Sequence, residues 1–463
     1  MRAAGTAFLL LAPALAVAQG RPAPSGPLTL PQLQELARQN DPRTWMARAQ
    51  VDNAQGKLDE LRWAVFPKFE TQLSLAGPTP EARFNKGGPD ASSPVIGHPT
   101  SILDVTPGSQ CWFCGSLGIG LGATVNMVLP IYTFGKLSAG KQATEHLVGA
   151  TTELVKRAYD QAVFDVTRAY WGYQTTREAN KSVVEVRGRL AEYRQRAQKL
   201  LAERSDQITK SDAMKLDYLA EEIEARTAES TKNAALALTG IRLIIGKGPE
   251  DRLEIVQQEL PQPPAQPNED EMLRKALQQR PETRAAAEQV KARMALLDLE
   301  RAKLWPDLAI VGTATWNYTS SADYPQTPFA YNPYNQKSAY AALALRGSFD
   351  IPQKLARIRQ AEADVREAVA QQSGADHLVR LEIRQALGDL NEARERVVRY
   401  TNESTIGKQL AIQAGLAFDS GLGEARELLE DMLLWARADG EKFKALFDAQ
   451  IAWASLQKAI GGL

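Results

Sequence analysis

The stretch RWAVFP at residues 62–67 recurs as RAKLWP at residues 301–306, and this recurrence decides how the chain is organised. The closing prolines of the two stretches are 239 residues apart (306 − 67), and so are Pro42 and Pro281 (281 − 42). A match that keeps its spacing over several positions indicates an internal repeat. Because a period of this length is far longer than a solenoid unit, we infer a duplicated domain.

The duplication continues towards the end of each half. Asp212 matches Glu427, and Gly246 matches Gly461, both at a separation of 215 (427 − 212). A cluster of prolines follows the first half, which is the composition of a linker. We therefore predict a first repeat, a proline-rich linker or equatorial segment, and a second repeat, at 19–245, 246–270 and 271–463.

Alternating side chains predict strands in both repeats. Residues 117–127, LGIGLGATVNM, have an apolar residue at every other position, with glycine, threonine or asparagine between. One apolar face and one small or polar face is typical of a transmembrane barrel strand, although a half-buried strand of a soluble sheet alternates in the same way. Three further stretches alternate similarly, at 69–75, 308–316 and 343–349. Aromatic residues gather near the strand ends, at Trp316, Tyr318, Tyr324, Tyr331, Tyr334 and Tyr340. A long external loop is predicted at 78–114.

Long helices are expected after the second strand of each repeat. No proline occurs between Pro130 and Pro249 or after Pro352, so nothing interrupts helical hydrogen bonding there. A helix over 136–203 would be roughly 100 Å long at 1.5 Å per residue, which is too long for an ordinary globular core. Its heptad seam is predicted at Val183, Val186, Leu190, Tyr193, Ala197 and Leu200. The helical hairpins are expected to turn near 205–207 and near 415–423.

The first residues have the features of a secretory signal. Arg2 supplies a positive charge, Ala7–Leu15 an apolar stretch and Ala16–Ala18 a small-residue cleavage site, which predicts a signal peptide over 1–18. Beyond it, no run of 18 apolar residues predicts a membrane-spanning helix. The 55 basic and 55 acidic side chains cancel, so the overall charge does not indicate a nucleic-acid-binding protein.

Four strands cannot close a barrel, and open strand edges are not tolerated in lipid. Two copies of the chain would supply eight strands, whose interior is filled by side chains, whereas three copies would supply twelve strands and an open lumen. We therefore predict an α+β membrane protein, internally duplicated, with four transmembrane strands per protomer. In a trimer these strands would form a 12-stranded barrel, continued by a long periplasmic α-helical barrel.

The sequence resembles the TolC family of outer-membrane efflux proteins over about residues 29–463. The resemblance rests on the duplicated helix–(Phe/Trp)-Pro–strand junction, on LPIYTFG at 129–135 and on FDSGLGEARELLE at 418–430. It implies a homotrimer in the outer membrane that extends into the periplasm. It also implies a passive exit duct of a tripartite efflux or type I secretion system, which docks onto a periplasmic adaptor (membrane fusion) protein and an inner-membrane pump of RND or ABC type.

The resemblance also implies roles at the periplasmic tip. Acidic rings narrow the closed entrance in this family, and the matching positions are Glu427 and Glu430, which share one helix face at i and i+3. Glutamate stands here where the family has aspartate, and a solvated acidic face would give the same pattern. The adaptor-facing residues would be Phe418, Asp419, Gly421, Leu422 and Gly423. Together with Gly415, these glycines are expected to permit a tight turn. The first-half tip departs from the family pattern, with Asp206 where glycine is usual.

Cys111 and Cys114, the two cysteines of the chain, form a CWFC motif. Such a pair serves redox chemistry, a metal site or a small structural disulfide. No βαβ pattern surrounds the motif, and the nearby histidine, His98, does not complete a zinc site. For an exported chain we interpret the pair as a disulfide that stiffens the external loop.

Two alternative functions follow from parts of the sequence. A soluble, elongated coiled-coil scaffold or adaptor in the periplasm would explain the helices but not the symmetrically placed strands. A periplasmic redox enzyme would depend on the CWFC motif. The sequence contains no nucleophile elbow, phosphate-binding loop or HExxH motif. We therefore expect a protein that is not an enzyme and needs no cofactor.

Overall fold

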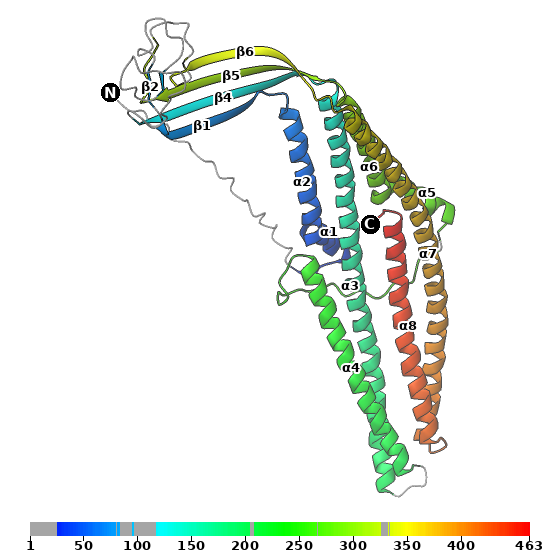
Figure 1. Cartoon of the computed structure of the whole chain (residues 1–463). Helices are drawn as coiled ribbons and strands as arrows, with labels where there is room; N and C mark the ends of the chain where they lie inside the picture. Colours follow the sequence, from blue (N-terminus) through cyan, green and yellow to red (C-terminus); the bar gives the residue numbers. More distant parts are fainter. Residues whose placement is uncertain are drawn as a thin grey trace. The chain divides into compact units, whose positions relative to one another are not determined.

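The computed structural model describes residues 26–79, 81–83, 95–96, 117–203, 208–265, 267–325, 332 and 334–463. The predicted signal peptide and the Cys111–Cys114 pair lie outside these residues. The described helices are α1 (Leu30–Asn40), α2 (Pro42–Trp63), α3 (Lys136–Ala202), α4 (Lys210–Ile244), α5 (Glu269–Gln279), α6 (Pro281–Ala302), α7 (Ile351–Asp419) and α8 (Ala425–Ala459) (Figure 1). The described strands are β1 (Lys68–Thr79), β2 (Ala82–Arg83), β3 (Val95–Ile96), β4 (Gly118–Tyr132), β5 (Asp307–Thr319) and β6 (Lys337–Arg346).

The order of elements confirms the predicted internal duplication. Apart from the short β2 and β3, each half consists of two short helices, two strands and two long helices. Matched elements have matched lengths: α1 and α5 have 11 residues each, α2 and α6 have 22, and α4 and α8 have 35. The long first members of the hairpins, α3 and α7, have 67 and 69 residues.

Proline sets the break between the two short helices of each half. Asp41 precedes Pro42 and Arg280 precedes Pro281, and both have φ −64° and ψ 128°. The proline ring disfavours the helical conformation of the residue before it, so the chain leaves the first helix there. Proline fits the first position of the next helix because its missing N–H has no partner there in any case.

Glycine ends the last helix of each half in the same way. Gly246 has φ 76° and Gly461 has φ 73°, a region that glycine enters without strain. A Cβ atom at Gly246 would lie 2.9 Å from the Cβ of Asn40, and one at Gly461 would lie 3.0 Å from the Cα of Arg280. Glycine is therefore required both by the backbone conformation and by the close approach of the preceding short helix.

The four longer strands form one antiparallel sheet in the order β1-β4-β5-β6. Each repeat contributes two neighbouring strands, and β4 joins β5 across the two repeats. The predicted loop at 78–114 contains a small additional sheet, in which Ala82 pairs with Ile96 and Arg83 with Val95.

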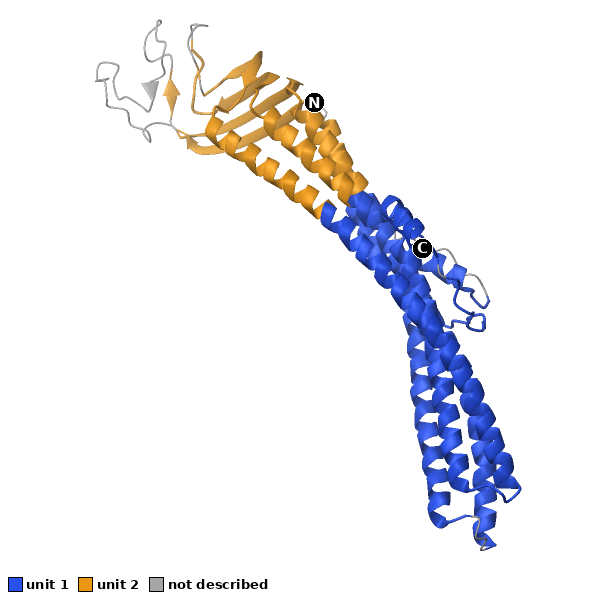
Figure 2. Cartoon of the chain, turned by 90° about the vertical axis from the view of Figure 1, so that its right-hand side faces the viewer, with its two compact units in different colours: residues 1–50, 151–285, 373–463 blue, residues 51–150, 286–372 orange. Residues whose placement is uncertain are grey.

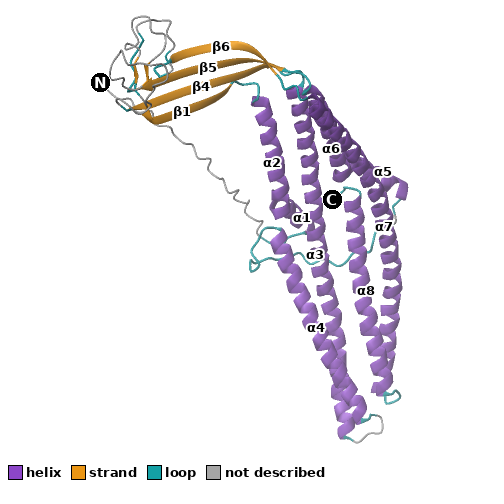
Figure 3. Cartoon of the chain, in the orientation of Figure 1, coloured by secondary structure: helices purple, strands orange, loops and turns teal. Residues whose placement is uncertain are grey.

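The chain divides into two compact units, and each unit draws on both repeats (Figure 2). Unit 1 contains residues 26–50, 151–285 and 373–463, and unit 2 contains residues 51–150 and 286–372, within the described ranges. Unit 2 holds the four-stranded sheet, whereas unit 1 is built from helices and the extended linker (Figure 3).

The core of unit 1 confirms the predicted heptad seam. Five of its residues are buried in a cluster that joins α3, α4, α7 and α8, and Val183 packs at the edge of that cluster. Trp435 of α8 is the largest fully buried side chain in the described part of the chain. Two further clusters surround α5 and α1, so that both short first helices are fixed to the long ones.

Candidate functional site

The strand register places the apolar residues of all four strands on one face of the sheet. Leu73 faces Ala123, which faces Trp316, and Leu343 pairs with Ile310 on the same face. Leu73 and Leu75 are more than 70% exposed in the protomer. An apolar surface that extends over all four strands needs a cover of lipid or protein. One apolar face per strand is the pattern of a transmembrane barrel.

The opposite face of the sheet is lined by polar and small residues. The register aligns Glu70, Asn126, Thr313 and Tyr340 across the four strands. Thr313 donates a hydrogen bond to Asn126 over 3.0 Å. This face can therefore contact water while the other contacts lipid.

Aromatic side chains form two bands, one near each end of β5. Trp316 and Tyr318 stack at one end, with ring centroids 6.5 Å apart. Near the other end Phe134 stacks on Trp305 at 6.0 Å and Tyr132 meets Phe134 edge-on at 4.7 Å. The eleven positions from Trp305 to Trp316 (316 − 305), of which β5 begins at Asp307, span at most about 37 Å at the rise of a strand, or about 26 Å across a bilayer if the strand tilts by about 45°. That height matches the apolar band of roughly 25 Å between the aromatic girdles of membrane barrels.

The sequence predicted only the band that contains Trp316. The other band includes Trp305, which belongs to the duplicated junction that marks the repeat. Its separation of eleven residues from Trp316 (316 − 305) is the signal in the sequence that could identify this band.

The turn of the second hairpin is closed by backbone hydrogen bonds. The N–H groups of Leu422 and Gly423 both donate to the carbonyl oxygen of Ala417 over 2.9 Å. Gly421 has φ 78°, and a Cβ at Gly423 would lie 2.8 Å from the Cβ of Ala417. Both glycines are therefore needed, as predicted. Leu422 is 89% exposed at this turn.

Phe418 and Gly415 have roles that differ from those predicted. The Phe418 side chain is 2% exposed and meets Tyr193 edge-on, with ring centroids 6.3 Å apart. It is a core residue of unit 1, so its predicted contact with an adaptor does not hold for the side chain. Gly415 lies inside α7 rather than in the turn, where a Cβ would lie 1.9 Å from the Tyr193 hydroxyl. Burial and the nearby Asp419 carboxylate raise the pKa of Tyr193.

The two glutamates at the predicted gate are exposed on the first turns of α8. Glu430 accepts a hydrogen bond from Arg426 over 3.0 Å. Glu427 has no hydrogen bond or ion pair with any residue that the structure describes. Glu430 is therefore paired within the protomer, whereas Glu427 is not paired with any described residue.

At the start of α4 the matching acid is engaged in a capping box. Thr209 donates from its backbone N–H (3.1 Å) and its hydroxyl (2.6 Å) to Asp212, and Asp212 donates from its N–H to the Thr209 hydroxyl. The hydrogen bonds from Thr209 keep the pKa of Asp212 below its usual value. Asp206 and Gln207 lie outside the described residues.

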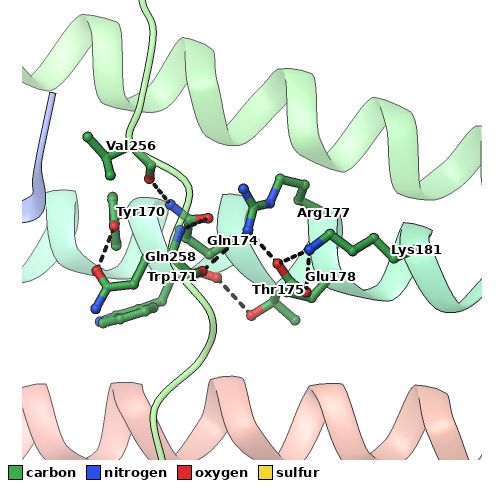
Figure 4. Close-up of polar contacts among 9 residues, drawn as sticks. All are labelled: Tyr170, Trp171, Gln174, Thr175, Arg177, Glu178, Lys181, Val256 and Gln258. Carbon is green, nitrogen blue, oxygen red and sulfur yellow. Dashed lines mark hydrogen bonds and ion pairs between the residues drawn. The ribbon is translucent and has the colours of Figure 1, made fainter. Parts of the chain in front are cut away.

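The linker forms an extended strap, residues 253–261, that is fixed across α3 (Figure 4). Gln174 of α3 is fully buried, and its amide donates to the Val256 carbonyl over 2.7 Å and accepts from the Gln258 N–H over 3.3 Å. Tyr170 donates to the Gln258 side chain over 3.0 Å. On α8, Gln450 donates to the Pro261 carbonyl over 2.7 Å. These contacts hold the linker against the long helices.

In the described part of the chain, no helix is both long and apolar enough to span a bilayer. Over the same residues, no cluster of three or more histidine, cysteine or acidic side chains is arranged to hold a metal ion.

Comparison with known proteins agrees with this geometry. Residues 272–462 match the model of a family described as outer membrane efflux protein. None of the curated protein sequences matches the chain.

Solved structures share the fold over nearly the whole chain. The outer-membrane channel OprN superposes with a TM-score of 0.73 at 18% identity, covering 94% of this chain and 90% of that one. The CmeC outer membrane channel of Campylobacter jejuni gives 0.72 at 15% identity, covering 94% and 85%. The open state of the MtrE outer membrane channel of Neisseria gonorrhoeae gives 0.69 at 16%, covering 94% and 89%. The chain thus matches the outer membrane efflux protein family by sequence over residues 272–462, and it shares the fold of solved outer-membrane channels over 94% of its length.

Proposed function

We propose that this chain is one subunit of an outer-membrane efflux channel, a passive exit duct that extends into the periplasm. The observation that carries the proposal is the sheet, whose register places apolar residues on one face of all four strands. Lipid covers that face, and the polar face lines the duct. A soluble periplasmic scaffold, the alternative function, would leave the apolar face without a cover.

We further propose that three copies assemble. Within the described residues, β1 and β6 each pair along one edge only, and unpaired edges are not tolerated in lipid. Pairing of β6 with β1 of the next copy closes the sheet. Three copies give twelve strands and an open lumen, whereas eight strands would be filled by side chains.

Lysine substitutions on the two faces of the sheet test the membrane assignment. Leu73→Lys and Leu343→Lys place a charge on the apolar face, where a lysine costs about 2–4 kcal/mol at the bilayer midplane and less towards the aromatic bands. Gln72→Lys and Ser338→Lys place the same charge on the polar face and serve as matched controls. We expect the first pair to reduce heat-modifiable trimer in outer-membrane fractions, and the second pair to leave it unchanged. Equal effects of both pairs, or a water-soluble monomer for the unchanged protein, would contradict the proposal.

The exposed carboxylates of Glu427 and Glu430 support an acidic ring at the periplasmic entrance. Three copies would bring six carboxylates near the axis, where crowded like charges favour cations. We expect Glu427→Ala with Glu430→Ala to change conductance and cation block in planar bilayers. Glu392→Gln, an exposed acid elsewhere on α7, is the control. Unaltered currents in the double variant would rule out the ring.

The second hairpin turn is the proposed contact with a periplasmic adaptor, through Asp419, Gly421, Leu422 and Gly423. The support is Leu422, an aliphatic side chain held almost fully in solvent by a rigid turn. Leu422→Arg is expected to weaken co-purification of the adaptor without changing trimer assembly, whereas Leu236→Arg, an exposed leucine on α4, is the control. Mass spectrometry of the captured complex identifies whether the inner-membrane pump is of RND or ABC type. Retention of the adaptor by Leu422→Arg would exclude this contact.

For Cys111 and Cys114 we propose a structural disulfide in the external loop. Replacement of both by serine is expected to preserve export, and loss of export would instead favour the redox alternative.

A further inference from the structure

The charged residues of the polar face gather at one end of the sheet. Because β1 follows α2 and β6 precedes α7, Lys68 and Arg346 lie at the end of the strands that adjoins the helices of unit 2 (Figure 3). Glu70 and Asp307 lie on the same face near the same end. Over the rest of this face, the described residues of the four strands are uncharged. Any electrostatic selection by the polar face must therefore occur at this end.

Three of these charged residues line one cavity on the polar face. Its volume is about 560 Å³, and its walls include Lys68 and Glu70 of β1 and Arg346 of β6. The remaining walls come from the end of α2, from β4 and from the segment that leads into α3. The cavity therefore brings together charges from the two outer strands of the sheet.

The positive charges at this end outnumber the negative ones. Asp307 is the cross-strand neighbour of Arg346, but its carboxylate is paired with Lys136 over 2.8 Å. The side chains of Lys68, Glu70 and Arg346 form no hydrogen bond or ion pair with any described residue. Three basic and two acidic side chains leave one net positive charge in each protomer (3 − 2 = 1).

Fixed charges in a wall of this kind act on the ions beside them. A water-filled space with low-dielectric walls focuses the field of the charges that line it. Rings of arginine and lysine favour anions in pores, as rings of acidic residues favour cations. Guanidinium and ammonium groups are also the usual partners of carboxylate and phosphate oxygens. The unpaired Lys68 and Arg346 are therefore suited to attract anionic groups.

We propose that Lys68 and Arg346 form a basic belt at the base of the polar face, which attracts anions and the anionic groups of the exported cargo. This inference rests on the proposed function, in which the polar face lines the duct. Glu70 weakens the belt without cancelling it. The belt has the opposite sign to the proposed acidic ring of Glu427 and Glu430.

The proposed trimer makes the basic belt continuous. β6 runs towards the helices and β1 runs away from them. Antiparallel pairing of β6 with β1 of the next copy therefore sets the Arg346 end of one copy beside the Lys68 end of the next. Three copies place three net positive charges around the duct.

The reactivity of an introduced thiol measures the local potential at the belt. In trimers without the natural thiols (Cys111→Ser with Cys114→Ser), Ala344→Cys places a partly exposed reporter on the polar face, two positions from Arg346. The rates of a negatively and a positively charged methanethiosulfonate reagent are compared. In about 0.1 M salt, Lys68→Gln with Arg346→Gln should lower the anionic-to-cationic rate ratio at least about threefold, and in about 1 M salt the difference should vanish by screening.

Three further variants at the same reporter sharpen this test. Glu70→Gln should raise the rate ratio, because it removes the opposing charge. Lys68→Arg with Arg346→Lys keeps both charges and should keep the ratio. Lys337→Gln is the matched control, since it removes a positive charge from β6 but on the apolar face, and it should leave the ratio unchanged.

A second reporter limits the effect to one end of the sheet. Ser338→Cys lies on the polar face eight positions from Arg346 (346 − 338), and its rate ratio in about 0.1 M salt should not respond to the glutamine variants. None of the replaced side chains has a partner in the described chain, so each variant should keep the heat-modifiable trimer band.

Ion selectivity in planar bilayers provides the functional measurement. In a Glu427→Ala and Glu430→Ala background, which removes the charge of the tips, Lys68→Gln with Arg346→Gln should shift the reversal potential in a KCl gradient towards cation selectivity. If channels conduct but neither the rate ratio nor the reversal potential changes, the basic belt is overturned and the channel stands. If the unchanged protein does not conduct, the proposed function fails and the belt fails with it.

Discussion

The two helical hairpins of this chain have nearly the same lengths but are closed by different means. At the first tip Thr209 and Asp212 form a side-chain capping box. At the second tip the N-cap residue Glu424 makes no side-chain hydrogen bond, and glycines shape the turn instead. The acid at the matching position is thus used for folding in the first hairpin and remains exposed as Glu427 in the second. A duplicated motif can therefore hold stability in one copy and leave charge available for function in the other.

The largest expected effect comes from Trp435, which has no aromatic counterpart in the first hairpin. The matching residue there is Ala220 (435 − 215). Trp435 is buried, with Lys408 at 5.3 Å and Arg189 at 5.9 Å from its ring. Trp435→Ala should destabilise the second hairpin by about 3–5 kcal/mol.

Hydrogen exchange measured separately for the first hairpin (α3 and α4) and the second hairpin (α7 and α8) checks this prediction. Protection should fall mainly in α7 and α8, and Leu434→Ala, at an exposed neighbour, should have little effect. Unchanged protection in α8 would show that the two hairpins do not differ in this way.

Gly415 provides the second test, because its close contact with Tyr193 joins α7 to α3. Gly415→Ala should destabilise by about 1–3 kcal/mol, since the buried tyrosine has no room to move. Gly388→Ala, in the same helix with open space around it, should instead stabilise by about 0.5–1 kcal/mol. Thermal unfolding of both variants measures these changes in stability. The combination of Gly415→Ala with Tyr193→Phe is measured in the same way, because it lacks the hydroxyl that the added Cβ would meet. A destabilised Gly388→Ala would argue against the distinction.

An exchange of caps should make the two tips more alike. Thr209→Ala removes the cap of α4 and should cost about 1 kcal/mol, whereas Glu424→Thr introduces a cap on α8 and should gain about 0.5–1 kcal/mol. Local hydrogen exchange at the first turns of α4 and α8 is the measurement. If Glu424→Thr leaves the hydrogen exchange of the first turn of α8 unchanged, the glycine turn does not permit the geometry of an N-cap.

The smallest effect concerns pH at the first tip. The lowered pKa of Asp212 means that its ionised form stabilises the folded tip above the ordinary pKa of about 4, and this contribution is lost as the pH falls through the folded value. Opening of the start of α4 should therefore increase with acid in the unchanged protein, but not in Asp212→Asn. The second tip, without this cap, is the internal control. An equal response of both tips to acid would contradict the assignment.

Local patterns were sufficient to predict the four longer strands and the long helices, whereas β2 and β3 lie in a stretch predicted as a loop. The alternation of apolar and polar residues predicts the two faces of each strand. The strand register then aligns the apolar faces of neighbouring strands on one side of the sheet. The helix breaks follow from Pro42 and Pro281, because proline acts on its immediate neighbour. The tip glycines Gly421 and Gly423 were also predicted, since a tight turn restricts the backbone within a few residues.

Contacts between distant segments were not predictable in this way. Phe418 carries the motif of an exposed tip, but Tyr193 of another helix covers it. Glycine commonly marks a turn, so the sequence predicts one at Gly415, whereas in the structure Gly415 lies inside α7 and leaves room for the Tyr193 hydroxyl. Gln174 gives no signal in the sequence as the residue that fixes the strap.

The sequence by itself determined the duplication, the amphipathic strands and the proline-free helices, because each depends on the spacing of residues along one segment. The tertiary structure alone decided which side chains are buried, which carboxylates are paired and where cavities lie. Burial and electrostatics depend on which segments are in contact in the folded protein. Those contacts are determined by the packing of distant segments and not by any local sequence pattern.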